Sequence, residues 1–128
     1  MGYRSDVCII LYARKPEHYP AIKLFADENF PGLEGEYPLF TKTEHPEKCM
    51  LEYNSRAVKW YDGYEGVQNT DAFLRKFEEL FDPGYNEGAE IEGAYEFIRI
   101  GEDTEDVEEQ RSPTADYFLG VTREFYIA

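Results

Sequence analysis

Acidic side chains gather in residues 86–110, which hold ten carboxylates and a single basic residue, Arg99. Carboxylates at this density can bind basic side chains through charge-assisted hydrogen bonds. If residues 102–109 form a helix, four carboxylates fall on one stripe, about 5–6 Å apart. These four are Glu102, Glu105, Asp106 and Glu109. The sequence leaves open whether 102–110 is helix or loop.

Three interpretations of this acidic segment compete. It can be a solvated surface that only aids solubility. It can be a docking surface that imitates nucleic acid and binds a basic partner. It can also be a divalent metal site, but the calcium-loop spacing of alternating acids followed by glycine is absent. The candidate partner-binding acids are Glu92, Glu96, Glu102, Asp103, Glu105, Asp106, Glu108 and Glu109.

Aromatic residues cluster beside further acids in residues 60–66, which read Trp-Tyr-Asp-Gly-Tyr-Glu-Gly. Exposed aromatic side chains make good anchors for protein partners. We therefore add Tyr61 and Tyr64 to the candidate partner-binding residues. The alternative is that Trp60 fills the core while the two tyrosines pack at its edge.

Catalytic motifs are missing. His18 and His45 both stand next to prolines, and no zinc-binding His-Glu-x-x-His or Cys-x-x-Cys motif is present. Phosphate-binding loops, dinucleotide-binding glycine motifs and the serine nucleophile motif are absent as well. The sequence therefore predicts a non-catalytic protein with no cofactor and no metal. A small enzyme that uses carboxylates stays open, because 27 acids provide many pairs.

The elements that must position these residues follow from hydropathy patterns and turn residues. A strand with two apolar faces is expected at 3–13, and a polar, irregular connection at 31–48. Asn54-Ser55 suggests a hairpin turn within 49–61. The expected helices are 20–29 and 70–81, and the other expected strands are 49–53, 56–61, 93–100 and 116–127.

This order of elements indicates an α+β protein whose residues 1–128 form a single domain. It is the order of a ferredoxin-like β-α-β-β-α-β sandwich with one added C-terminal strand. That last strand, 116–127, would be an edge strand able to support a dimer.

Composition excludes several classes of partner. The 128 residues carry a net charge of −14, so direct binding to a nucleic-acid backbone is disfavoured. No apolar run approaches the roughly 20 residues that a membrane span needs. No secretory signal precedes the first strand, so we expect a cytoplasmic protein that does not contact membrane.

Two segments carry a resemblance to a family. Residues 1–7, Met-Gly-Tyr-Arg-Ser-Asp-Val, and the block from Phe97 to Asp103 resemble small, acidic, uncharacterised phage and prophage proteins. The resemblance implies a phage origin and, by analogy with other small acidic phage proteins, an inhibitor of host machinery. The expected partner is a basic nucleic-acid-binding host protein, for example the effector that an anti-CRISPR protein blocks. The alternative is a phage accessory domain that binds its partner through aromatic surface, with charge serving solubility only.

Overall fold

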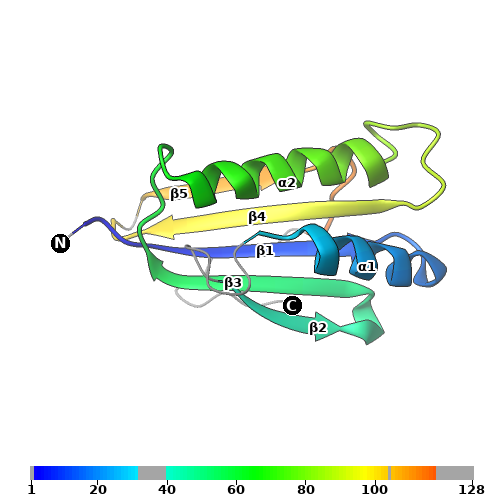
Figure 1. The fold of residues 1–128 in the computed structure, drawn as a ribbon, viewed down its shortest axis with the longest axis horizontal. Helices are drawn as coiled ribbons and strands as arrows, with labels where there is room; N and C mark the ends of the chain where they lie inside the picture. The colour runs from blue at the N-terminus through cyan, green and yellow to red at the C-terminus, as the bar shows by residue number, and fades with distance from the viewer. Residues whose placement is uncertain (1, 32–39, 104, 118–128) are drawn as a thin grey trace.

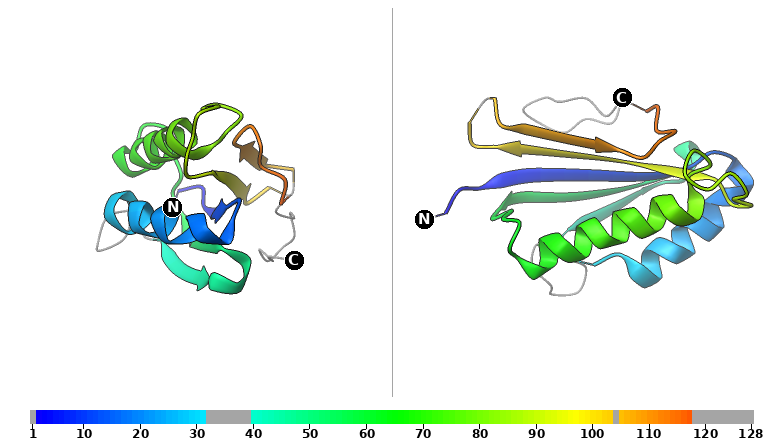
Figure 2. Two further views of the ribbon diagram at one scale, coloured as in Figure 1. Left: turned by 90° about the vertical axis from the view of Figure 1, so that its right-hand side faces the viewer. Right: turned by 90° about the horizontal axis from the view of Figure 1, so that it is seen from above.

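A five-stranded antiparallel sheet with the strand order β2-β3-β1-β4-β5 forms the centre of the computed structural model. The structure describes residues 2–31, 40–103 and 105–117. Both helices, α1 (Tyr19–Asn29) and α2 (Glu65–Phe81), lie on one face of the sheet (Figures 1 and 2). These features confirm the α+β class. The strands are β1 (Ser5–Ala13), β2 (Thr41–His45), β3 (Met50–Val58), β4 (Gly93–Gly101) and β5 (Val107–Arg111).

The central strand, β1, is apolar on both of its faces, as its sequence predicts. Val7 and Ile9 point toward the helices, whereas Cys8 and Ile10 belong to a second apolar cluster on the opposite face. Strands β3 and β4 pair with β1 on its two sides. A strand in this position needs apolar side chains in both directions because both faces of the sheet are covered.

Aromatic rings fill much of the core between the sheet and the helices. Phe30, which follows α1, stacks on Tyr53 of β3 with ring centroids 3.8 Å apart. Phe25 of α1 packs against Phe73 and Phe81 of α2 at 5.6 and 5.1 Å. The predicted helix at 20–29 is confirmed. Phe73 and Phe77 of α2 are buried and belong to this core.

The second helix begins earlier than the sequence predicts. Helix α2 starts at Glu65, five residues before the predicted position 70. Thr70 lies inside the helix, where its hydroxyl donates to the carbonyl of Gly66 at 2.8 Å. Val67, which is buried, extends the apolar stripe into this added turn.

The expected hairpin within 49–61 is wrong. Asn54 and Ser55 lie inside the continuous strand β3, where Asn54 pairs with Cys8 on one side and Thr41 on the other. The hairpin instead joins β2 to β3 through a short 3-10 turn at Pro46–Lys48. Strand β2 lies in the segment 31–48 that we expected to be irregular.

The acidic run at 102–109 is not a helix. Its first half belongs to the connection between β4 and β5, and its second half is β5, which pairs antiparallel with β4. The fifth strand of the sheet is therefore β5. The expected strand at 116–127 falls almost wholly outside the described residues, and so does the dimer edge that it would provide.

Within the described part of the chain, no helix has the length and apolar character to cross a membrane.

Candidate functional site

The candidate site is the end of the sheet where the chain passes from β4 to β5 and from β3 to α2. This is the end at which the arrow of β4 finishes in Figure 1. A hollow of about 420 Å³ opens here. Its walls are formed by Tyr3, Trp60, Tyr61, Asp62, Arg99, Asp106 and Glu108. The structure thus brings the acidic segment and the aromatic segment of the sequence to one place.

Arg99 is the most tightly held side chain of this site. Its guanidinium donates to both carboxylate oxygens of Asp106, at 2.8 and 3.1 Å, and to Glu108 at 3.0 Å. A fourth bond, of 3.1 Å, reaches the hydroxyl of Ser5. The hydrogen bonds to Asp106 raise the pKa of Arg99, and those from Arg99 and then Tyr3 lower the pKa of Asp106. These two carboxylates are therefore structural partners of Arg99.

Tyr3 links the N-terminal segment to this ion pair. Its hydroxyl donates to Asp106 at 2.7 Å and accepts the backbone N–H of Asp103 at 2.9 Å. Gly101 makes room for the contact, because a Cβ atom at this position would collide with the Asp106 carboxylate and the Tyr3 hydroxyl. The backbone N–H of Tyr3 in turn donates to the hydroxyl of Tyr61 at 2.8 Å.

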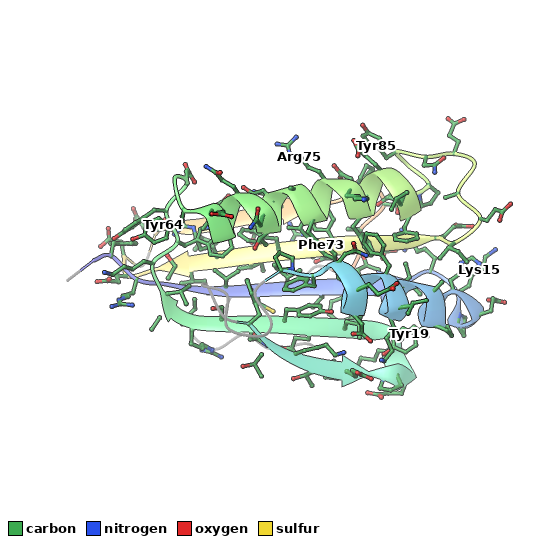
Figure 3. All side chains as sticks on the ribbon, in the orientation of Figure 1. Lys15, Tyr19, Tyr64, Phe73, Arg75 and Tyr85 are labelled. Atoms are coloured by element: carbon green, nitrogen blue, oxygen red, sulfur yellow. The ribbon has the colours of Figure 1, made fainter. Side chains whose placement is uncertain are left out.

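The aromatic segment divides between core and surface. Trp60 is only 9% exposed and packs against Phe97 of β4, with centroids 5.8 Å apart, so its predicted core role is confirmed. Tyr61 and Tyr64 are about one-third exposed and form an edge-to-face pair at 5.1 Å. Figure 3 shows Tyr64 at the same end of the sheet as the connection between β4 and β5.

The remaining acids around the hollow are exposed and make no ion pair with any residue that the structure describes. Glu102 accepts the backbone N–H of Arg4, which orients its carboxylate but supplies no opposite charge within ion-pair distance. Four of these unpaired carboxylates are Asp62, Glu102, Asp103 and Glu105.

Basic residues also occur at this end, on the side of β1 and β3. Arg4 donates to the carbonyl of Ala57, and Arg56 lies 3.6 Å from Asp6. Both hold the end of β3, where Ala57 has a positive φ of 53° and the pairing with β1 is irregular. The unpaired negative charge therefore lies on the side of β4, β5 and Asp62.

Three of the predicted acids lie elsewhere. Glu92 is at the opposite end of β4, 3.7 Å from Lys15. Glu109 points to the second face of the sheet and pairs with Arg111 at 3.2 Å. Glu96 is fully buried on that second face. The eight candidate acids therefore do not form one surface, because Glu92 lies at the far end of β4 and successive residues of a strand face opposite sides.

Buried Glu96 ties the segment after β5 to the sheet. Its carboxylate accepts the backbone N–H of Tyr117 at 2.8 Å and the hydroxyl of Tyr12 at 3.2 Å, and Arg111 lies 3.4 Å away. Burial raises the pKa of Tyr12 to about 12. The same Tyr12 hydroxyl accepts the backbone N–H of Asp116 at 2.7 Å. Glu96 thus has a structural environment and is not accessible to a partner.

The histidines occupy polar contacts away from the site. His45 lies 2.8 Å from Glu52, and His18 accepts the backbone N–H of Glu92 at 3.0 Å. Over the described residues, no group of three or more His, Cys, Asp or Glu side chains is arranged to hold a metal ion.

Several residues of the site escaped the sequence reasoning. Tyr3 and Asp62 were not singled out, and Arg99 was counted only as an isolated base. The one available signal was the alternation in β4, which puts Arg99 on the same face as Phe97 and so predicts a partly buried cation that needs acidic partners. Tyr3 gives no comparable signal, because its partners lie about a hundred residues away.

Comparison with known proteins adds no relative: no family model, no curated protein and no solved structure matches this chain.

Proposed function

We propose that this protein is a non-catalytic binding protein that docks on a basic, nucleic-acid-handling host protein and competes with nucleic acid. The observation that carries the proposal is the meeting of unpaired acids with exposed tyrosines at one end of the sheet. The unpaired carboxylates would take the place of phosphates and accept hydrogen bonds from Arg and Lys side chains of the partner. Tyr61 and Tyr64 would supply the desolvated contacts that fix the partner.

The wider setting of this proposal is a phage or prophage protein that acts in the cytoplasm of the host cell. Its support is the resemblance of residues 1–7 and 97–103 to small acidic phage proteins. An anti-CRISPR protein that blocks a nucleic-acid-binding effector is the most specific form of the proposal. In the same way we propose a ferredoxin-like relationship for the domain, which is supported by the neighbouring strands β2-β3-β1-β4 and by two helices on one face. Strand β5 lies outside that pattern.

The experiment is affinity capture from a bacterial lysate at low and high salt, followed by mass spectrometry. The test variant reverses the charge of three unpaired acids, Glu102→Lys, Asp103→Lys and Glu105→Lys. Asp106 and Glu108 are left intact because they pair with Arg99, and their loss would disturb the fold. The matched control reverses three exposed acids outside the site, Glu17→Lys, Glu87→Lys and Glu90→Lys.

We expect the wild type and the control variant to capture the same basic protein at low salt and to lose it at high salt. The test variant captures none of it. If the test variant retains the partner as well as the control does, the unpaired acids do not form the interface and the proposal fails.

The exposed pair Tyr61 and Tyr64 favours a second candidate function, a phage accessory domain that binds its partner through aromatic surface. Charge would then serve solubility only. This candidate predicts capture that resists salt, survives charge reversal and is lost in the double variant Tyr61→Ala and Tyr64→Ala.

A further inference from the structure

A second hollow lies beside the candidate site, between helix α2 and strand β5. Its volume is about 390 Å³, and it is lined by Asp71, Arg75, Glu78, Tyr95, Gln110 and Arg111. Asp71, Arg75 and Glu78 follow one another at helical spacing, so they form a polar stripe of α2 next to its buried stripe. Gln110 and Arg111 of β5, which lies behind α2 in the view of Figure 1, line the hollow opposite this stripe.

Tyr95 contributes a largely buried side chain whose hydroxyl opens onto the hollow. The residue is only 6% exposed and lies on the helix-facing side of β4. Its backbone bonds to Ser112, but among the residues that the structure describes its hydroxyl has no hydrogen-bond partner. Because Tyr95 lines the hollow, this hydroxyl is available to a ligand that enters it.

The carboxylates of the hollow are unsatisfied too. Asp71 and Glu78 are partly buried, and neither forms an ion pair or a side-chain hydrogen bond with a described residue. Burial and then the charge of Glu108 raise the pKa of Asp71, and burial followed by the charge of Asp82 raises the pKa of Glu78. The positive charge of Arg75 opposes both of these shifts, but neither carboxylate forms a direct ion pair that would compensate its partial removal from water.

Neither of the two arginines that line this hollow, Arg75 and Arg111, forms an ion pair with Asp71 or Glu78. Arg111 is engaged by Glu96 and Glu109, at 3.4 and 3.2 Å. Arg75 is exposed and lies beyond ion-pair distance of the described carboxylates, and Figure 3 shows its side chain extending from the upper side of α2. The hollow therefore presents two carboxylates and one hydroxyl that have no side-chain partner among the described residues. These hydrogen-bond acceptors suit a ligand with several N–H donors.

We propose that this hollow binds the guanidinium group of an arginine side chain presented by the partner. A guanidinium carries five N–H donors in a fixed plane, so it can reach Asp71, Glu78 and the Tyr95 hydroxyl together, whereas an ammonium group is a compact point charge. The inference deepens the proposed function, on which it rests. It names the anchor residue of the basic partner and places that anchor between α2 and β5, next to the unpaired acids.

The test is an NMR titration of the full chain with the peptide acetyl-Arg-Arg-Arg-amide, compared with acetyl-Lys-Lys-Lys-amide. We expect the arginine peptide to shift the resonances of Tyr95 and Gln110 and to bind more tightly than the lysine peptide. The isosteric double variant Asp71→Asn and Glu78→Gln weakens binding roughly tenfold, and Tyr95→Phe weakens it by a smaller factor. The matched control, Glu79→Gln and Glu90→Gln, leaves it unchanged.

Thermal unfolding of the same variants separates a binding role from a structural one. Because unpaired carboxylates destabilise the folded state, the double variant should unfold at the same temperature as the wild type or a higher one. Three results would each overturn the inference. The first is an unaltered peptide affinity in the double variant, and the second is a set of NMR shifts confined to the connection between β4 and β5. The third is a lower unfolding temperature of the double variant. The variant Glu102→Lys, Asp103→Lys and Glu105→Lys distinguishes the two proposals. If it still captures the host protein, the proposed function fails, whatever the peptide does in the hollow.

Discussion

Arg99 on β4 holds Asp106, seven residues further along the chain, through two hydrogen bonds of 2.8 and 3.1 Å between guanidinium and carboxylate. This paired geometry fixes the connection between β4 and β5 and sorts the acidic segment into two groups. Asp106 and Glu108 neutralise Arg99, whereas Glu102, Asp103 and Glu105 stay exposed and unpaired within the described structure. Only the second group is available to a partner.

The pH dependence of stability should report the pair of Asp106 and Arg99. The pKa of Asp106 is lowered in the folded state, so its contribution is fully present above the ordinary aspartate value of about 3.9 and is lost as the pH falls through the lower folded-state pKa. We expect Asp106→Asn to be less stable than the wild type at pH 7, with the difference shrinking below about pH 4. Urea unfolding from pH 7 to pH 2 measures it. A difference that stays constant down to pH 2 would show that the pair does not act through the ionised carboxylate.

Gly101 tests the packing of this same connection. A methyl group there would collide with the Asp106 carboxylate and the Tyr3 hydroxyl, so Gly101→Ala should cost about 1–3 kcal/mol of unfolding free energy. Gly63→Ala is the matched control: nothing lies within 4 Å of its added Cβ, and a change within about 0.5 kcal/mol is expected. Equal effects of the two substitutions in urea unfolding would contradict the described packing.

The parts of the fold that sequence predicts are those that repeat an apolar pattern. Strand β1 and helix α1 follow directly from the spacing of their buried residues. Strand β2 does not, because its sequence Thr-Lys-Thr-Glu-His has no buried residue and it is held by backbone pairing with β3. The prediction of a hairpin at Asn54-Ser55 is wrong for a similar reason. A strand that pairs with a neighbour on each side tolerates turn-forming residues, because backbone hydrogen bonds hold both of its edges.

The site was predictable only in composition. The number of acidic residues in the sequence points to the acidic segment, and the cluster Trp-Tyr-Asp-Gly-Tyr predicts the exposed tyrosines. Sequence cannot distinguish the paired from the unpaired carboxylates, because their partners depend on strand register and on Tyr3 at the other end of the chain. Glu96 shows the size of this effect, since it looked like a surface acid and is completely buried.

Ala57 is held in the left-handed region, with φ at 53°, where the end of β3 departs from regular pairing with β1. Glycine adopts this conformation without steric cost, although it also gives the unfolded chain more freedom. We expect Ala57→Gly to stabilise the protein by about 1 kcal/mol. The comparison is Ala94→Gly in β4, a buried residue of a regular strand, which should destabilise it. A loss of stability in both variants would argue against the strained conformation at Ala57.

Buried Glu96 should be essential for stability but not for partner binding. Glu96→Ala leaves Arg111 without its buried partner and removes the acceptor of the Tyr117 N–H, so we expect a loss of about 3–5 kcal/mol. Glu96→Gln keeps an acceptor oxygen and should lose less. Hydrogen exchange of the Asp116 and Tyr117 amides provides a local readout, and faster exchange in both variants is expected. Unchanged exchange would mean that other contacts hold this segment.

The most direct test of the central claim is the salt dependence of affinity for the captured basic partner. The wild type and the control Glu17→Lys, Glu87→Lys and Glu90→Lys are compared with the variant Glu102→Lys, Asp103→Lys and Glu105→Lys. We predict that affinity falls steeply with salt for the first two proteins and that the third does not bind measurably at any salt concentration. Equal affinities and equal salt slopes for all three proteins would contradict the claim that the unpaired acids at this end of the sheet bind the partner.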